Sequence, residues 1–119
     1  MQQDAGKAMI FEALFDVQTQ IEQRQWQPLA EGVFVSTLHQ SGENGSRSAL
    51  LHYLPGASVP RHLHAGLEYI LILQGSQIDG DRIYETGTLV IHKPGSDHAI
   101  KSPEGCVALG VWEKPVVFQ

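Results

Sequence analysis

Short apolar runs recur along the chain at nearly even spacing, and turn-forming residues separate them. The runs cover residues 32–38, 49–54, 68–73, 88–91 and 107–112 and are rich in aliphatic and aromatic side chains. Glycine, proline, asparagine and aspartate cluster between the runs, and Asp79-Gly80-Asp81 is typical of a hairpin turn. Many short strands joined by such turns predict an all-β sandwich or barrel.

The beginning of the chain follows another pattern. Apolar residues between Phe11 and Gln25 fall roughly on one helical stripe, but Gln-rich polar sequence follows and no strong cap is evident. This stretch is predicted either as a helix or as a short strand followed by a loop. A length of 119 residues favours one domain. We therefore predict an N-terminal extension or short arm at residues 1–25 and a single β domain at residues 26–119.

The predicted strand at residues 68–73 is apolar on both faces. Glu68, Ile70 and Ile72 share one face because alternate residues of a strand point the same way. The opposite face then carries Tyr69, Leu71 and Leu73. An apolar outer face usually requires cover, so this pattern predicts a homodimer formed through such strands.

Composition and charge exclude several classes of protein. At 42% apolar and 18% charged residues, the chain has the composition of an ordinary globular protein. The net charge of −5, with scattered basic residues, argues against a nucleic-acid partner. No apolar run approaches the roughly 18 residues of a membrane span, and no secretory signal is evident, so we expect no membrane partner and a cytoplasmic location. The single cysteine, Cys106, excludes an internal disulfide and a thiolate-based zinc site within one chain.

The candidate chemistry lies in three histidines and one glutamate. His62 and His64 lie two residues apart, so on a strand both point to the same face. Glu68 shares their parity and returns to the same centre if the chain bends only locally, while His98 follows a tight Pro-Gly turn. Imidazoles with one carboxylate suit Zn²⁺, Fe²⁺, Mn²⁺, Ni²⁺ or Cu²⁺. These four residues are therefore predicted to bind one divalent transition metal.

Several other side chains have two interpretations each. Arg61 is expected either at the mouth of the barrel, facing an anionic ligand, or in solvent. His52 is favoured as a hydrogen-bonded structural residue over a partner of a metal ligand. His39 and His92 lie near predicted turns and are expected to be exposed, and Cys106 is expected to be a buried small hydrophobe. Core packing, or an apolar wall beside the metal, is expected for Phe34, Ile70, Ile72 and Trp112.

The spacing of the predicted ligands resembles the cupin superfamily. Gly56-x5-His62-x-His64-x3-Glu68-x6-Gly75 reproduces the first cupin motif in full. The second motif is similar in Gly87…Pro94-Gly95-x2-His98, although the proline comes one place late and Ser102 stands where an asparagine often lies. The resemblance implies an RmlC-like double-stranded β-helix, or jelly-roll barrel, with His62, His64, Glu68 and His98 as ligands. It implies one ion per chain, with Zn²⁺ first and Fe²⁺, Mn²⁺ or Ni²⁺ as alternatives.

Further segments between residues 26 and 112 resemble the ChrR-type cupins, among them Trp26-Gln-Pro-Leu, Lys93-Pro-Gly-Ser-Asp-His-Ala and Ser102-Pro-Glu-Gly-Cys. That family takes its name from a zinc-dependent anti-sigma factor, whose N-terminal helical domain binds the sigma factor. This chain has no room for that domain and lacks its His-x3-Cys-x2-Cys motif, so direct sigma-factor binding is not expected from it alone. It also has Tyr69 where relatives often have a second glutamate.

Three functions are compatible with this resemblance. The favoured one is a stress-related or regulatory module that responds to a small molecule or to redox state. The alternative is a metal-dependent dioxygenase acting on a small diketone or thiol, and a purely structural metal domain is the third. The sequence leaves open whether the protein is an enzyme.

Overall fold

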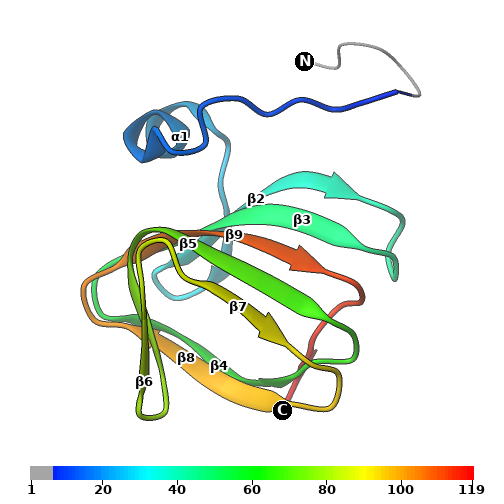
Figure 1. Cartoon of the computed structure of the whole chain (residues 1–119), viewed down its shortest axis with the longest axis vertical. Coiled ribbons are helices and arrows are strands. Elements are labelled where there is room, and N and C mark those ends of the chain that lie inside the picture. Colours follow the sequence, from blue (N-terminus) through cyan, green and yellow to red (C-terminus); the bar gives the residue numbers. More distant parts are fainter. Residues whose placement is uncertain (1–6) are drawn as a thin grey trace.

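The chain is built almost entirely from β-strands (Figure 1). A computed structural model describes residues 7–119, and within this range it has one helix and ten strands. The helix is α1 (Val17–Gln23). The strands are β1 (Gln27–Ala30), β2 (Val33–Gln40), β3 (Arg47–Tyr53), β4 (Ala57–Leu63), β5 (Glu68–Asp79), β6 (Arg82–Glu85), β7 (Leu89–His92), β8 (Asp97–Ser102), β9 (Cys106–Trp112) and β10 (Val117–Phe118).

The strands form one antiparallel sheet that curls into a half-barrel. Its order is β1-β2-β3-β9-β5-β8-β4-β10, and β6 and β7 pair with β5 outside this path. β5 joins the two halves, because its first part pairs with β9 and β7 while its last residues pair with β6 and β8. As a result, β4 and β8 lie across from β2, β3 and β9 (Figure 1). This arrangement confirms the all-β cupin barrel predicted from the sequence.

Each of the five predicted runs overlaps a strand, and the predicted hairpin turn is present. Asp79 of β5 lies opposite Arg82 of β6, and Gly80 between them has a φ of 62°, a left-handed conformation that glycine adopts without strain. The helix is shorter than the candidate stretch at Phe11–Gln25. No strong cap was predicted, but the helix has one, since the Asp16 carboxylate accepts a hydrogen bond from the Thr19 amide at 3.3 Å.

Two apolar clusters pack against opposite faces of the sheet. The larger one fills the interior of the half-barrel and includes Val33, Leu51, Ile72 and Ile100. The smaller one lies on the outer face, where Val17 of α1 packs with Leu50, Leu73 and Val107. The helix therefore covers part of the outer face, and Leu73 is buried within the chain itself. Cys106 belongs to the larger cluster and is buried, as expected for a small hydrophobe.

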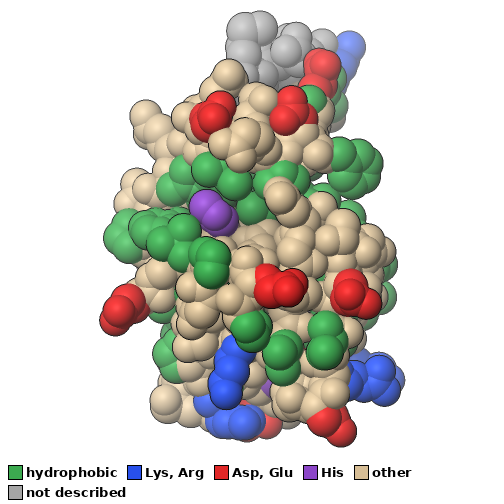
Figure 2. Space-filling model, turned by 90° about the vertical axis from the view of Figure 1, so that its left-hand side faces the viewer, with side chains coloured by type: hydrophobic (Ala, Val, Ile, Leu, Met, Phe, Trp, Pro, Cys, Tyr) green, Lys and Arg blue, Asp and Glu red, His purple; other side chains and the backbone are tan. Residues whose placement is uncertain are grey.

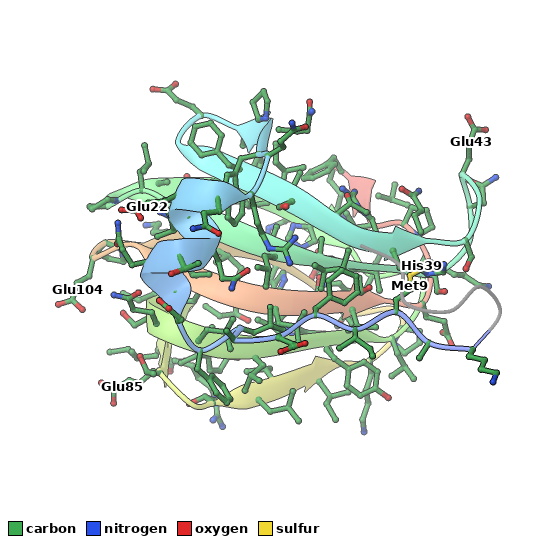
Figure 3. The ribbon with its side chains drawn as sticks, turned by 90° about the horizontal axis from the view of Figure 1, so that it is seen from above. Met9, Glu22, His39, Glu43, Glu85 and Glu104 are labelled. Atoms are coloured by element: carbon green, nitrogen blue, oxygen red, sulfur yellow. The ribbon has the colours of Figure 1, made fainter. Side chains whose placement is uncertain are left out.

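Part of the outer face away from the helix is exposed. We call the outer strip the group of exposed apolar residues Tyr69, Leu89, Ile91 and Val111. Val111 and Ile91 are the register partners of Tyr69 on its two sides, so the outer strip is continuous across three strands. The segment before α1 runs lengthwise over the sheet on this same side (Figures 1 and 3). On the face seen in Figure 2, hydrophobic side chains form several groups interrupted by acidic ones.

Residues 7–119 include no helix that is both long and apolar enough to cross a membrane.

Candidate metal centre and its pocket

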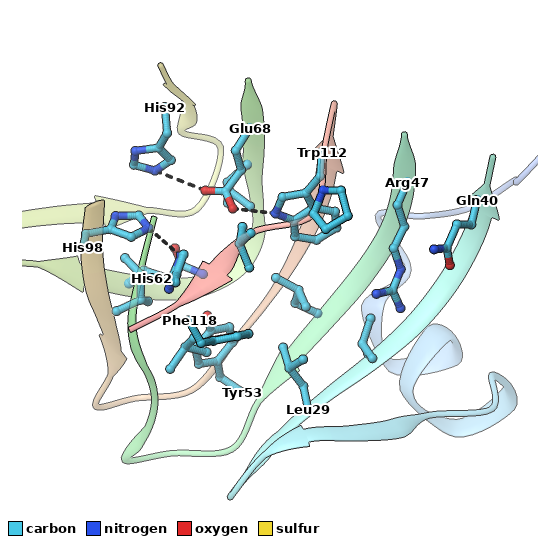
Figure 4. A pocket seen from close by; sticks show the side chains of 18 of the residues that line it. Leu29, Gln40, Arg47, Tyr53, His62, Glu68, His92, His98, Trp112 and Phe118 are labelled. Atoms are coloured by element: carbon cyan, nitrogen blue, oxygen red, sulfur yellow. Dashed lines mark hydrogen bonds and ion pairs between the residues drawn. The ribbon is translucent and has the colours of Figure 1, made fainter. Parts of the chain in front are cut away.

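The curl of the sheet brings the four predicted ligands together. His62 lies on β4 opposite His98 of β8, His64 follows β4, and Glu68 begins β5. All four side chains point into the half-barrel, and their residues are 1–6% exposed. Three of them are labelled in Figure 4. The site is therefore assembled from the consecutive strands β4 and β5 and from β8, which lies further along the chain.

His62 and His98 are held by hydrogen bonds at the ring nitrogen that faces away from the cluster. His62 Nδ1 lies 2.9 Å from the Pro60 carbonyl oxygen, and His98 Nδ1 lies 2.8 Å from the Asp79 carboxylate. Both partners are acceptors, so each Nδ1 carries the proton and donates it. The neutral rings then present the lone pair of Nε2 toward the cluster, as in metal-binding histidines oriented by a carboxylate or carbonyl.

His64 is oriented in the same way by Ser96. The Ser96 hydroxyl donates to the Lys93 carbonyl oxygen at 2.6 Å, so its oxygen accepts from His64 Nδ1 at 2.9 Å. His64 Nε2 is buried and has no hydrogen-bond partner. A buried nitrogen acceptor without a partner is costly, and a bound cation would satisfy it.

The three Nε2 atoms converge on one point. His62 Nε2 and His98 Nε2 are 3.1 Å apart, although both are acceptors in the tautomers described above. Only a cation between them, a proton or a metal ion, makes this approach favourable. Ligand atoms of His62, His64 and His98 all lie within 4.8 Å of one another. This buried cluster can therefore hold a metal ion, since nitrogen ligands bind such ions at about 2.1 Å.

Glu68 lies beside the three histidines and is itself oriented. Its Oε1 is 3.1 Å from His64 Nε2, within ion-pair distance. Its Oε2 accepts a 2.5 Å hydrogen bond from the indole nitrogen of Trp112, which Figure 4 shows beside it. Trp112 thus holds one carboxylate oxygen and leaves the other facing the histidines. It had been predicted only as a core or wall residue.

His92 is the site residue that sequence reasoning placed wrongly. It was expected to be exposed near a turn, but its side chain is only 12% exposed. It lies opposite Glu68 in the β5–β7 pair, with Nε2 3.7 Å from Glu68 Oε1, and its ring stacks on that of His64. Glu68, His92 and His98 form a second group whose ligand atoms lie close together. The sequence does contain a signal for the inward position of His92. In β7, Val90 and His92 share one face, and Leu89 and Ile91 lie on the opposite face.

Burial and mutual contacts set the charges in this cluster. Burial lowers the pKa of His62 and of His92, because it removes water from the charged imidazolium. Burial alone would raise the pKa of Glu68, but its contacts with His64, His92 and Trp112 outweigh this and lower it. Burial would likewise lower the pKa of His64, but the Glu68 carboxylate outweighs it and raises the pKa. The cluster therefore combines an ionised carboxylate with neutral imidazoles at His62 and His92, the forms that bind metal.

A cavity of about 330 Å³ opens in front of the cluster. One wall of the cavity is formed by His62, Glu68, His92 and His98. The segment after β9 crosses to β4, and there β10 pairs with the part of β4 that carries His62 (Figure 1). Other lining residues include the apolar Val35, Leu51, Val59, Ile70, Ile100, Pro115, Val116 and Phe118. This volume falls within the range of pockets that bind small molecules.

Three other candidates lie away from the cavity. Arg61 forms a 3.5 Å ion pair with Asp97 on the surface. Of its two expected positions, it therefore occupies the one in solvent and not the one at the mouth of the barrel. His52 points to the outer face, where its ring packs edge-on against Trp26. Phe34 is the register partner of His52, so it also lies on the outer face and does not form a wall of the site.

The comparisons with known proteins agree with this fold. The family model of the ChrR cupin-like domain matches residues 15–116. The chain belongs to this family. The anti-sigma-E factor ChrR of Cereibacter sphaeroides is 32% identical over 101 residues, which cover 82% of this chain but 46% of that protein. The chain therefore spans less than half the length of this relative.

Solved structures show the same likeness. The structure of Rhodobacter sphaeroides SigE in complex with the anti-sigma ChrR matches with a TM-score of 0.68 and 30% identity, covering 77% of this chain and 50% of that one. An acetylacetone dioxygenase from Acinetobacter johnsonii matches with a TM-score of 0.74 and 17% identity, covering 99% of this chain and 80% of that one. At that identity the second likeness establishes the fold alone.

Proposed function

We propose that this cupin binds one divalent transition metal through His62, His64, Glu68 and His98. The observation that carries the proposal is the convergence of three buried Nε2 atoms whose rings are each fixed at Nδ1 by a separate acceptor. Nitrogen and carboxylate ligands favour Zn²⁺ first, with Fe²⁺, Mn²⁺ and Ni²⁺ as alternatives. When bound, such an ion would polarise a carbonyl or a similar group of a ligand in the cavity.

Metal analysis tests this assignment. Protein purified without added chelator should hold about one equivalent of a transition metal per chain, and X-ray absorption should detect imidazole ligands. Substoichiometric metal after reconstitution with each of the four ions would contradict the proposal.

We propose that the metal serves a regulatory module that responds to a small ligand. The family supports this role, because its relative ChrR is an anti-sigma factor, and so does the cavity in front of the cluster. Ligand binding is then expected to change the structure without turnover. Sigma-factor binding is not part of this proposal.

A metal-dependent dioxygenase is the second candidate, supported by a cavity that reaches His62, Glu68 and His98. The likeness to acetylacetone dioxygenase concerns the fold, so activity has to be measured. Oxygen consumption by the Fe²⁺-loaded protein, followed over a panel of diketones and thiols, separates the two roles. Turnover that disappears in His62→Ala would favour the enzyme, and its absence across the panel would favour the regulatory module.

We further propose that a second copy of the chain covers the outer strip, giving a homodimer. The support is four apolar side chains that are 37–56% exposed and continuous across β9, β5 and β7. Light scattering coupled to size-exclusion chromatography should give twice the chain mass at micromolar concentration. A monomer that persists up to 100 micromolar would be the contrary result.

A further inference from the structure

Arg47 stands at the far end of a row of residues that begins at the candidate metal centre. Register pairs join His92 to Glu68, Glu68 to Trp112, and Trp112 to Arg47 across four neighbouring strands. Residues directly opposite each other in a sheet share a face, so all four side chains point into the half-barrel. All four also line the cavity, and Figure 4 shows Trp112 between Glu68 and Arg47.

The guanidinium of Arg47 is incompletely satisfied. One terminal nitrogen donates to the Thr37 hydroxyl at 2.6 Å, which fixes the side chain. Its Nε is buried and has no hydrogen-bond partner. Among residues 7–119, no carboxylate lies within ion-pair distance of it. An unpaired donor on a permanent cation is costly, and an anion in the cavity would remove that cost.

The rest of the cavity limits what this anion can be. Apart from the charged residues and the histidines, the wall is mostly aliphatic and aromatic, with Gln40 and Gln77 as its polar members, so it favours a ligand with an apolar body. The α-carbons of Arg47 and Glu68 are two strand spacings apart, about 10 Å. A ligand that reaches from Arg47 to the metal centre along this row is therefore several bonds long.

We propose that the cavity binds a small monocarboxylate with an apolar body, its carboxylate held by Arg47 and a carbonyl group directed toward the metal ion. The position of the carbonyl rests on the proposed metal site, whereas the carboxylate contact does not. Guanidinium and carboxylate form paired charge-assisted hydrogen bonds, which makes Arg47 the residue that selects acids over esters. Arg61 cannot take this role, because it pairs with Asp97 outside the cavity.

Glu43 carries a negative charge that opposes the binding of an anion in this cavity. It lies on the turn between β2 and β3 and lines the same cavity, but its side chain is exposed and makes no ion pair with Arg47. A carboxylate ligand would therefore bind beside a negative charge. Glu43→Gln should strengthen binding of the acid and leave binding of its ester unchanged.

The test compares an acid with its ester by calorimetric titration. Zinc-loaded protein is titrated with 5-oxohexanoate and with methyl 5-oxohexanoate. The acid should bind about tenfold more tightly or better, the effect of a charge-assisted contact. Arg47→Met should remove this preference and Arg47→Lys should keep part of it, while the zinc content of both stays at one equivalent. Arg61→Met is the matched control and should retain the full preference.

A second arm separates this proposal from the metal site. Metal-free protein is titrated with hexanoate and methyl hexanoate, which lack the carbonyl. A preference for the acid that Arg47→Met abolishes supports the role of Arg47 even if the protein takes up no metal. Equal binding of acid and ester by wild type, or a preference unchanged in Arg47→Met, overturns the proposal while leaving the metal site standing. Circular dichroism melts establish that each variant is folded.

Discussion

The two faces of the sheet formed by β3, β9, β5 and β7 share one backbone but carry different chemistry. A transverse row of register partners on the inner face contains Arg47, Trp112, Glu68 and His92. The adjacent row, one residue along each strand, belongs to the outer face and contains Ser48, Val111, Tyr69 and Ile91. The inner row is rich in ionisable groups and the outer row is mostly apolar. Side-chain alternation alone separates them.

The outer face is itself divided. Leu50 is fully buried beneath α1, whereas Leu89, in the same transverse row, is 56% exposed. The helix covers one end of the row, whereas the other end is exposed. The inner face thus carries the candidate chemistry, one half of the outer face is buried beneath the helix, and the other half is the exposed region for which we propose a dimer contact. Substitutions should separate these three contributions.

The largest expected effect is the loss of metal from the inner face. His64→Ala removes a buried Nε2 that faces the cluster beside Glu68, so the variant should hold less than a tenth of an equivalent of metal, compared with one for wild type. Chelator should then lower the melting temperature of wild type but not of the variant, because metal binding stabilises the folded state. His39→Ala is the matched control, since His39 is exposed on β2. Full metal content in His64→Ala would remove this histidine from the site.

The next effect concerns stability and leaves metal content unchanged. Leu50→Ala should lower the free energy of unfolding by about 2–5 kcal/mol, the usual cost of a cavity in a packed core. Leu89→Ala, measured as a monomer at low concentration, should cost no more than about 0.5 kcal/mol. Chemical denaturation of both variants gives the comparison. Similar losses for the two would contradict the division of the outer face.

The sequence predicted those site residues whose positions follow from short spacings along the chain. It did not predict those whose positions depend on which strands lie side by side. His62, His64 and Glu68 were found because short spacings and parity place them together. Arg47 and His92 were missed because their position follows from which strands pair. Arg47 meets Trp112 only because β3 lies beside β9, and His92 meets Glu68 only because β7 lies beside β5.

The helix α1 also has one feature that the sequence could predict and one that it could not. Its cap at Asp16 is local and could have been recognised, because aspartate is among the preferred residues at this position. Its packing on Leu50 and Val107 joins strands distant in the sequence, so the burial of Leu73 could not be predicted. For β5, the alternation predicted which face each side chain occupies, but it did not predict that the helix would bury Leu73.

A smaller effect should come from Gly110, which lies on the inner face beside the site. A Cβ at this position would clash with the indole ring of Trp112, so Gly110→Ala should displace the ring and weaken its bond to Glu68. We expect a loss of about 1–3 kcal/mol in stability, typical of overpacking. Metal affinity should fall about tenfold or more, as when a partner of a ligand is removed. Trp112→Phe should lower the affinity to a similar extent without the overpacking, and unchanged affinity in both variants would exclude the role of the indole.

The smallest effect is expected at the start of the helix that covers the outer face. The Asp16 carboxylate accepts hydrogen bonds from the amide and the hydroxyl of Thr19, so it satisfies a free amide of the first turn. Asp16→Ala should lower the free energy of unfolding by about 1 kcal/mol, and Asp16→Asn, which retains a capping oxygen, by less. Hydrogen exchange should accelerate in α1 and at the outer-face residues beneath it, while the inner face keeps its protection and its metal. An equal acceleration on both faces would mean that α1 stabilises the whole half-barrel and does not act as a local cover.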